Sequence, residues 1–393
     1  MDFEDLLNRG VSEIIKKDSL LEKIKSGKKL RIKHGVDATA TELTLGHSVV
    51  YLKMREFQKL GHKIVFLIGD FTSRIGDPTD RNEVRTMQSK EEVENNAQNY
   101  LKQVGKILNL NETETRRNSE WYGKMSLDKF TEILSKFSQQ QLIERDMFQQ
   151  RIKSGKPVWM HELIYPILQG YDSVMLKSDL TIIGSDQIFN EIQGRVLQEI
   201  YGQEPQDLLA VPLLVGTDGI QKMSKSLGNY IGLEEDSNSM FGKIMSLPDN
   251  VIIDYFTLTT TLPLSEIRQL DEQLTKRTVN PIEIKKKLAK EIVSFYHSKS
   301  AAESAEREFE KVSQKKEIPS KVNAFKPKSA SQLLVETIID AGFSQSKSQA
   351  KRLIRQGAVE IDGKQILDPS VKITFKPGQI LKVGKRGYIK IDL

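Results

Sequence analysis

The first half of the chain alternates short apolar runs with longer amphipathic stretches. Four apolar runs predict strands, at residues 30–33, 63–68, 181–183 and 208–214. The second of these runs is continuous, as is typical of a strand buried on both faces of a parallel sheet. Val50, Met54 and Phe57 recur at i, i+4 and i+7 and predict a helix over 46–60 that ends at Gly61. Strands alternating with helices predict an α/β fold with a doubly wound parallel sheet, whose ligands bind beyond the carboxyl ends of the strands.

The second half of the chain changes character twice. From about 238 to 312 the periodicity is helical, and Asn280 followed by Pro281 predicts the start of a helix with the asparagine as its N-cap. Residues 313–329 hold five lysines and two prolines with little apolar content, which indicates a linker. We therefore expect four parts, namely a sheet domain at 1–232, a small helical domain at 233–312, a linker at 313–329 and a small α+β domain at 330–393.

The last of these parts is basic. A predicted helix at about Ser346 to Gln356 carries Lys347, Lys351 and Arg355 on one outer face. Residues 330–393 hold 11 Lys or Arg against 6 Asp or Glu, a net charge of about +5, whereas the whole chain has +6. A basic domain on a nearly neutral body favours a polyanionic partner such as nucleic acid over a merely solvated surface.

Composition excludes several classes of function. The 393 residues contain no cysteine, which rules out disulfides, thiolate metal sites, iron–sulfur clusters and a cysteine nucleophile. No apolar run approaches the ~18 residues of a membrane helix. The first five residues carry acidic side chains and no Lys or Arg, unlike a secretory signal. We expect a cytoplasmic protein with no membrane partner.

Two loops carry residues suited to binding phosphate groups. Residues 36–47 join a predicted strand to a helix N-terminus, where backbone N–H groups and the helix dipole favour an anion, and Thr39 and His47 can donate hydrogen bonds. Residues 222–229, Lys-Met-Ser-Lys-Ser-Leu-Gly-Asn, form a cationic loop that can close on a polyphosphate and neutralise charge in a transition state. The alternative for residues 36–47 is an ordinary strand–helix connection with a capping histidine. The alternative for residues 222–229 is a solvated turn.

A third segment carries a polar stripe on an otherwise apolar helix. Tyr165, Gln169 and Asp172 stand at i, i+4 and i+7 and therefore share one face. A stripe that packs in the core would be apolar at these positions. The pattern favours a polar-lined pocket, and the alternative is a helix edge at the surface.

These segments resemble the signatures of a known family. Leu45-Gly46-His47 resembles the "HIGH" signature of class I aminoacyl-tRNA synthetases, and residues 222–226 match their "KMSKS" signature letter for letter. Residues 75–79, 165–172 and 184–187 resemble the tyrosyl-tRNA synthetases within that class. Residues 346–354 and 357–359 resemble an S4 RNA-binding domain, which bacterial tyrosyl enzymes carry at this end and tryptophanyl enzymes do not. The resemblance implies a Rossmann-like catalytic domain, a helical domain and an α+β S4-like domain.

The resemblance also implies a two-step reaction. Tyrosine attacks the α-phosphate of ATP to give tyrosyl-adenylate and pyrophosphate, and the tyrosyl group then moves to the 3′ end of tRNA-Tyr. Without a covalent enzyme intermediate, catalysis consists of positioning and charge stabilisation. Mg²⁺ would accompany ATP on its phosphates without a dedicated protein cage. A homodimer is implied as well, with an interface expected between about 109 and 161.

By matching motifs, the resemblance assigns roles to residues of this chain. Residues expected to take part in catalysis are Thr39, His47, Lys222, Lys225, Arg81 and Arg85. Residues expected to bind ATP are Ala38, Thr39, Gly46, His47, Gly184, Asp186, Lys222, Met223, Ser224, Lys225 and Ser226. Residues expected to bind tyrosine are Lys33, Gly35, Asp77, Tyr165, Gln169, Asp172 and Gln187, with Asp172 accepting the phenol hydroxyl. Residues expected to bind RNA are Lys347, Lys351, Arg352 and Arg355. No residue is expected to bind a metal.

The chain departs from the family pattern at four positions. Thr44 replaces the first histidine of "HIGH", Ala38 replaces a proline, and Ile183 replaces a glycine. Lys33 aligns with a tyrosine that reads the phenol in much of the family, so either Asp172 carries more of the discrimination or Lys33 contributes in a different way. Two other functions remain open at this point. A related synthetase could activate tryptophan, or the chain could be an RNA-binding paralogue without catalytic activity.

Overall fold

The computed structural model describes residues 3–79, 89–314, 322–384 and 387–393. The chain divides into two compact units, residues 1–296 and 297–393. The helices before residue 297 therefore belong to the same unit as the main sheet, while the domain boundaries expected at 232, 312 and 329 stay predictions. No helix in the described part of the chain is long and apolar enough to cross a membrane.

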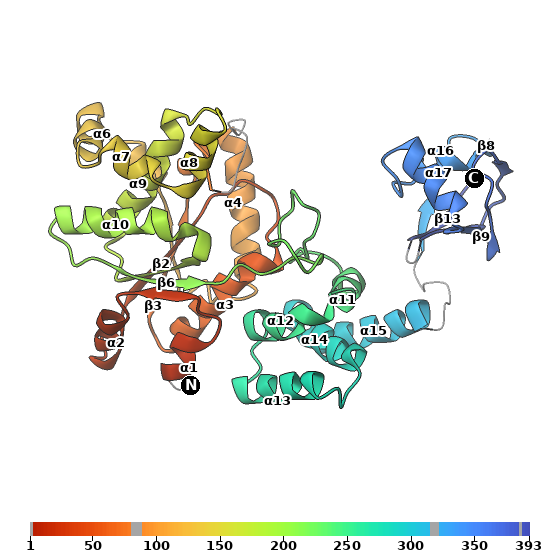
Figure 1. The fold of residues 1–393 in the computed structure, drawn as a ribbon, viewed down its shortest axis with the longest axis horizontal. Helices are drawn as coiled ribbons and strands as arrows, with labels where there is room; N and C mark the ends of the chain where they lie inside the picture. The colour runs from red at the N-terminus through yellow and green to blue at the C-terminus, as the bar shows by residue number, and fades with distance from the viewer. Residues whose placement is uncertain (1–2, 80–88, 315–321, 385–386) are drawn as a thin grey trace. The chain divides into compact units, whose positions relative to one another are not determined.

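The first unit is built on a six-stranded sheet with the order β1-β6-β5-β2-β3-β4 (Figure 1). Its strands are β1 (Glu13–Ile15), β2 (Arg31–Val36), β3 (Lys63–Ile68), β4 (Glu114–Arg117), β5 (Leu180–Gly184) and β6 (Asp207–Val211). All neighbouring strands are parallel except β1 and β6, which are antiparallel. The doubly wound parallel sheet is confirmed. The strand expected over 208–214 ends at Val211, where Pro212 follows and has no N–H for the ladder.

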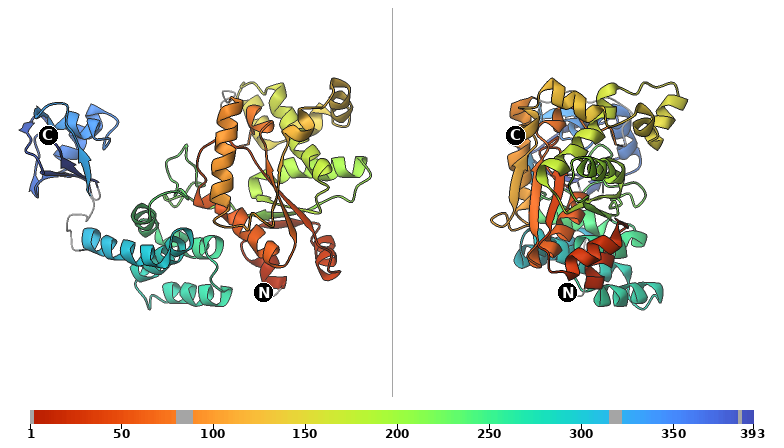
Figure 2. Two further views of the ribbon diagram at one scale, coloured as in Figure 1. Left: turned by 180° about the vertical axis from the view of Figure 1, so that it is seen from behind. Right: turned by 90° about the vertical axis from the view of Figure 1, so that its left-hand side faces the viewer.

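Helices cover both faces of this sheet. The large ones are α3 (Leu45–Lys59), α4 (Lys90–Val104), α9 (Met160–Leu176) and α10 (Ile188–Ile200). Figure 2 shows α3 and α4 on one face and α9 and α10 on the other. The chain runs from β2 to β3 in one direction along the sheet and from β5 to β6 in the other. Right-handed crossovers then place α3 and α10 on opposite faces, so that β2 and β5 flank the switch point where ligands bind.

Shorter elements complete the first unit. They are α1 (Phe3–Asn8), α2 (Lys17–Lys25), α5 (Ser119–Tyr122), α6 (Leu127–Leu134), α7 (Gln139–Ile143), α8 (Asp146–Lys153) and the 3₁₀ turns η1 (Thr72–Arg74), η2 (Ser185–Gln187) and η3 (Asp249–Val251). The helical stretch holds α11 (Ser237–Met245), α12 (Ile252–Thr259), α13 (Leu264–Thr275) and α14 (Pro281–Tyr296). The predicted start of α14 is confirmed, because Asn280 Oδ1 accepts a hydrogen bond from the Ile282 N–H at 3.0 Å.

The second unit begins with helix α15 (Lys299–Phe309) and the π-helical turn η4 (Glu310–Gln314). Its strands are β7 (Asn323–Phe325), β8 (Ser331–Leu333), β9 (Val359–Ile361), β10 (Lys364–Gln365), β11 (Lys372–Thr374), β12 (Ile380–Val383) and β13 (Gly387–Ile391). Five of them form a sheet in the order β10-β9-β12-β13-β7, and β8 pairs with β11. Helices α16 (Leu334–Asp340) and α17 (Lys347–Arg355) share a core with this sheet, as expected for a small α+β domain.

Candidate active site

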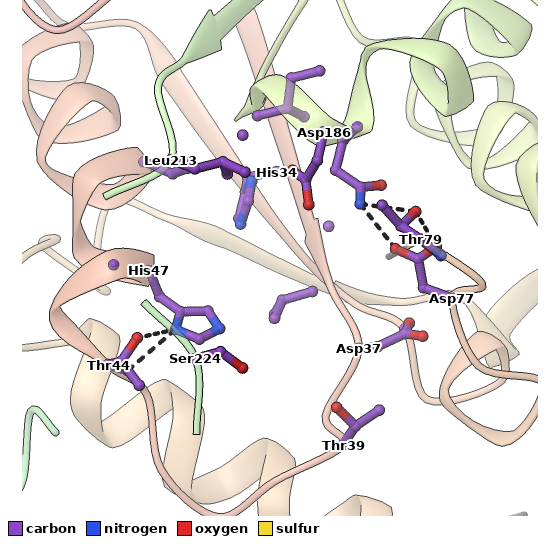
Figure 3. Close-up of a pocket in the computed structure, with 18 of the residues that line it drawn as sticks. His34, Asp37, Thr39, Thr44, His47, Asp77, Thr79, Asp186, Leu213 and Ser224 are labelled. Atoms are coloured by element: carbon purple, nitrogen blue, oxygen red, sulfur yellow. Dashed lines mark hydrogen bonds between the residues drawn. The ribbon is translucent and has the colours of Figure 1, made fainter. Parts of the chain in front are cut away.

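A cavity of about 1070 Å³ opens at the carboxyl ends of the central strands (Figure 3). One part of its wall, which we call the loop end, is formed by residues from three segments, 39–47, 184–186 and 222–227. The other part, the buried end, is formed by Lys33, Asp77, Tyr165, Gln169, Asp172, Gln187 and Glu191. The three segments singled out in the sequence therefore meet in one place, although they are far apart along the chain.

Nearly all residues that the resemblance assigns to ATP and tyrosine line this cavity, Gly35 included. Ala38 does not, since its side chain is fully buried and its carbonyl accepts a hydrogen bond from Asn96 Nδ2 at 3.0 Å. Arg81 and Arg85, which were assigned to catalysis, lie outside the described residues.

At the loop end, His47 is a neutral hydrogen-bond donor. Its Nδ1 accepts the backbone N–H of Thr44 at 3.2 Å and lies 2.8 Å from the Thr44 hydroxyl oxygen. The crowded cavity wall and the nearby Lys225 ammonium lower the pKa of His47, although the residue itself is exposed. With Nδ1 accepting and the ring neutral, the proton sits on Nε2. Figure 3 shows the ring reaching from the start of α3 into the cavity, with Thr44 on the Nδ1 side.

The loop with two lysines is anchored at its base. Asn229 Oδ1 accepts the Ser224 N–H at 2.8 Å, and its Nδ2 donates to the Lys222 carbonyl at 3.1 Å and to Asp218 at 2.8 Å. The Lys225 ammonium donates to the Glu42 carbonyl. Lys222 Nζ lies 4.0 Å from Asp186 Oδ2, and both residues line the cavity. The loop thus brings two cations to the cavity wall that also holds His47, so this end suits a polyphosphate.

At the buried end, the polar stripe on α9 faces the cavity. Tyr165 and Asp172 are buried, so the alternative of a surface helix edge is wrong. The Tyr165 hydroxyl donates to Asp37 Oδ2 at 3.1 Å, and Gln187 Nε2 donates to Asp77 Oδ2 at 2.8 Å. Carboxylate and amide oxygens gathered at this point suit an ammonium group.

Asp172 lines the buried end of the cavity and is 3 % exposed. Its carboxylate accepts the Trp121 indole N–H at 2.9 Å and an Asn118 amide N–H at 3.3 Å. Burial raises the pKa of Asp172 to about 7, while the Lys33 cation and the neighbouring donors oppose that rise. A carboxylate offers about four acceptor positions, so Asp172 can accept a further hydroxyl from the cavity side.

Sequence reasoning missed Glu191, which lines the cavity beside Lys33. The signal was present, because Gln187, Asn190 and Glu191 stand at i, i+3 and i+4 and form a polar stripe on α10. The apolar side chains of the same helix at Ile192 and Val196 are exposed instead. A helix with an inverted pattern of this kind predicts a polar site on its inner face.

In the second unit, the four residues predicted to bind RNA are all exposed on α17. Lys347, Lys351, Arg352 and Arg355 lie opposite the buried side chains of Ala350 and Ile354. The predicted outward cationic face of this helix is therefore confirmed, while its RNA contacts stay a prediction.

Comparison with known proteins gives the class first. Residues 25–314 match the family of class I tRNA synthetases (W and Y), and residues 335–381 match the S4 domain. Tyrosine–tRNA ligase of Dehalococcoides mccartyi is 45 % identical over 98 % of each chain. Tyrosine–tRNA ligase of Carboxydothermus hydrogenoformans is also 45 % identical, covering 98 % of this chain and 97 % of its own.

A solved structure supports the fold. The C-terminally truncated mitochondrial tyrosyl-tRNA synthetase of Coccidioides posadasii matches with a TM-score of 0.64, covering 78 % of this chain and 91 % of its own at 24 % identity. The chain therefore belongs to the class I aminoacyl-tRNA synthetases and, among them, to the tyrosine–tRNA ligase family.

Proposed function

We propose that this protein attaches tyrosine to tRNA-Tyr in two steps, both in the cavity described above. The main observation behind the proposal is that one cavity combines a cationic loop end with a buried end that contains Asp172. The tyrosine–tRNA ligases at 45 % identity support tyrosine over tryptophan, and the complete cationic loop argues against a paralogue without catalytic activity.

In the first step, the tyrosine carboxylate attacks the α-phosphate, the bond between the α-phosphorus and the bridging oxygen breaks, and pyrophosphate leaves. Negative charge grows on the phosphate oxygens, where Lys222, Lys225 and the Nε2–H of His47 stabilise it. Thr39 and the backbone at Gly46 support the same phosphates, and Gly184 and Asp186 face the ribose. The protein forms no covalent bond to substrate, so these groups act by charge and position.

The buried end selects the amino acid. Asp77, Tyr165, Gln169 and Gln187 hold the ammonium group, and Asp172 accepts the phenol hydroxyl. Phenylalanine lacks that hydroxyl and would leave a buried carboxylate without its partner, which costs binding energy.

Mg²⁺ fits this site as a companion of the nucleotide. The loop end presents cations and N–H donors, and the described residues offer no cluster of three His, Asp or Glu side chains that could hold a metal ion. Phosphate oxygens and water are the ligands that Mg²⁺ prefers, so we propose that it arrives bound to ATP.

Two further proposals concern partners. The cationic face of α17 is expected to bind tRNA phosphates, and removing residues 330–393 should spare adenylate formation but cripple tRNA charging. Equal charging by the truncated protein would contradict the RNA-binding role.

A homodimer is proposed because large apolar side chains between 109 and 161 are exposed, namely Leu127, Ile152, Trp159 and Met160. Sedimentation of the purified protein tests it. We also propose that the protein acts in the cytoplasm, as the curated tyrosine–tRNA ligases at 45 % identity come from bacteria.

The proposed activity is tested by amino-acid-dependent exchange of pyrophosphate into ATP, with tyrosine, phenylalanine and tryptophan compared. Exchange with tyrosine alone is the expected result. Exchange with tryptophan would contradict the pocket assignment. A folded protein that binds RNA but exchanges with none of the three would contradict the proposed reaction.

A further inference from the structure

The buried end contains an ion pair that the proposed reaction does not use directly. Lys33 and Glu191 are each 1 % exposed. Lys33 Nζ lies 3.0 and 2.8 Å from the two carboxylate oxygens of Glu191 and 2.7 Å from the Ser173 hydroxyl oxygen. These three acceptors account for the three N–H donors of an ammonium group. Lys33 is therefore committed to the protein and acts on a substrate hydroxyl only through its charge.

The two ends of this pair reach two different parts of the tyrosine pocket. On one side, Glu191 Oε1 accepts the Gln169 amide at 2.9 Å, and Glu191 Oε2 accepts the Gln206 amide at 2.9 Å. The Gln169 carbonyl in turn accepts Asn190 Nδ2 at 2.9 Å. Both polar atoms of the Gln169 side chain are thus fixed, and this side chain belongs to the ammonium-binding set.

The chain of contacts continues from Asn190 to the acidic end of that set. Asn190 Nδ2 also donates to the Gln187 carbonyl at 3.0 Å, and Gln187 donates to Asp77 at 2.8 Å. One continuous network therefore links the Lys33–Glu191 pair to Asp77.

On the other side, the pair lines the same end of the cavity as Asp172, the residue proposed to read the hydroxyl. Lys33 contacts Ser173, which directly follows Asp172 in α9. Its positive charge favours the ionised form of Asp172 against the cost of burial. The other titratable groups around this carboxyl are Tyr122 on α5, Tyr165 on α9 and Glu191 on α10.

We propose that the Lys33–Glu191 pair determines amino-acid specificity as a positioning device. Lys33 keeps Asp172 an acceptor for the substrate hydroxyl, and Glu191 orients Gln169 at the opposite end of the pocket. The inference rests on the proposed tyrosine pocket. A buried ion pair contributes little net stability compared with an apolar pair of the same size, so a purely structural role would be served as well by apolar residues.

Lys33→Met tests the charge. Pyrophosphate exchange is measured with tyrosine and with phenylalanine from about pH 6 to pH 9, together with thermal unfolding. We expect KM for tyrosine to rise about tenfold at neutral pH with KM for ATP within about twofold, and the preference for tyrosine over phenylalanine to fall about tenfold. The loss should diminish toward high pH, where Asp172 ionises without help.

Glu191→Gln separates the two halves of the proposal, because it keeps the cation. We expect a higher KM for tyrosine and a tyrosine-to-phenylalanine preference within about threefold of the unmodified protein. The double variant Lys33→Met/Glu191→Met removes both charges. It should regain thermal stability over Lys33→Met and keep the raised KM for tyrosine and its pH dependence.

Lys53→Met is the matched control, since Lys53 is 5 % exposed, pairs with Glu56 and does not line the cavity. Lys53→Met should lower the stability of the protein without changing the ratio of KM for tyrosine to KM for ATP. The proposal is overturned if the double variant regains full affinity for tyrosine, or if Lys33→Met behaves like Lys53→Met. If the unmodified protein shows no exchange with tyrosine, the proposed function fails instead, which is a separate result.

Discussion

The two ends of the cavity are built differently, although they line one continuous space. The loop end is held largely through the backbone, as in the Thr44 N–H to His47 and the Ser224 N–H to Asn229 contacts. The buried end is held by side chains that bond to one another, from Lys33 through Glu191 to Gln169. A phosphate chain needs charge that can close around it, whereas a small amino acid must be told from its analogues. Adaptable loops serve the first task, and a rigid buried network serves the second.

The largest effect is expected from removing a cation at the loop end. Lys225→Ala should lower the rate of adenylate formation by about 10²–10³-fold and leave tyrosine affinity unchanged, because its charge acts on the phosphates. Single-turnover kinetics with tyrosine titration measure both quantities. Lys276→Ala, at a 67 % exposed lysine that pairs with Glu272, is the control. A change in tyrosine affinity as large as the change in rate would contradict the assignment of Lys225 to the phosphates alone.

At the buried end, Asp172→Ala should weaken tyrosine binding by roughly tenfold to a hundredfold, because a charge-assisted hydrogen bond to the phenol is lost. ATP binding should hardly change. Equilibrium dialysis with each substrate separately gives the two affinities. An equal loss for both substrates would show that Asp172 supports the whole cavity and does not read the hydroxyl.

The two ends should also respond differently to pH. The pKa of Asp172 is raised to about 7, so below that pH its carboxyl is protonated and loses the negative charge that strengthens the hydrogen bond from the phenol hydroxyl. We expect kcat/KM for tyrosine to fall by up to about tenfold per pH unit below neutrality and to level off above it. The crowded cavity wall and the Lys225 cation lower the pKa of His47 and favour its neutral ring, so KM for ATP should change less over this range. Pyrophosphate exchange between about pH 5.5 and pH 8.5 measures both, and a KM for ATP that follows the same curve would contradict the assignment.

The smallest effect is expected at Thr44, where this chain departs from the family signature. Thr44→Val removes the hydroxyl beside His47 Nδ1 but keeps the backbone N–H that already fixes the tautomer. We expect a loss of about three- to tenfold in the exchange rate, with KM for tyrosine unchanged. A loss as large as that of Lys225→Ala would mean that the hydroxyl touches the phosphates itself.

Much of the loop end could be predicted from the sequence, because its chemistry lies in short contiguous segments. Residues 222–226 and the Gly46-His47 pair are recognisable by themselves, and both line the cavity. Ala38 shows the limit of this reasoning, since a residue inside a motif can still point into the core. The buried end was predicted only in part, through the stripe on α9.

The sequence alone therefore determined the alternation of strands and helices, the polar face of α9 and the two segments that we propose bind phosphate. These features depend on local periodicity and on neighbours a few residues apart. The tertiary structure decided that Lys33 pairs with Glu191, 158 residues away, and that Asn118 and Trp121 hold Asp172. It also decided which nitrogen of His47 faces the cavity. Periodicity shows which side of an element is polar, whereas partners on distant elements are chosen by sheet order and packing, which no local pattern encodes.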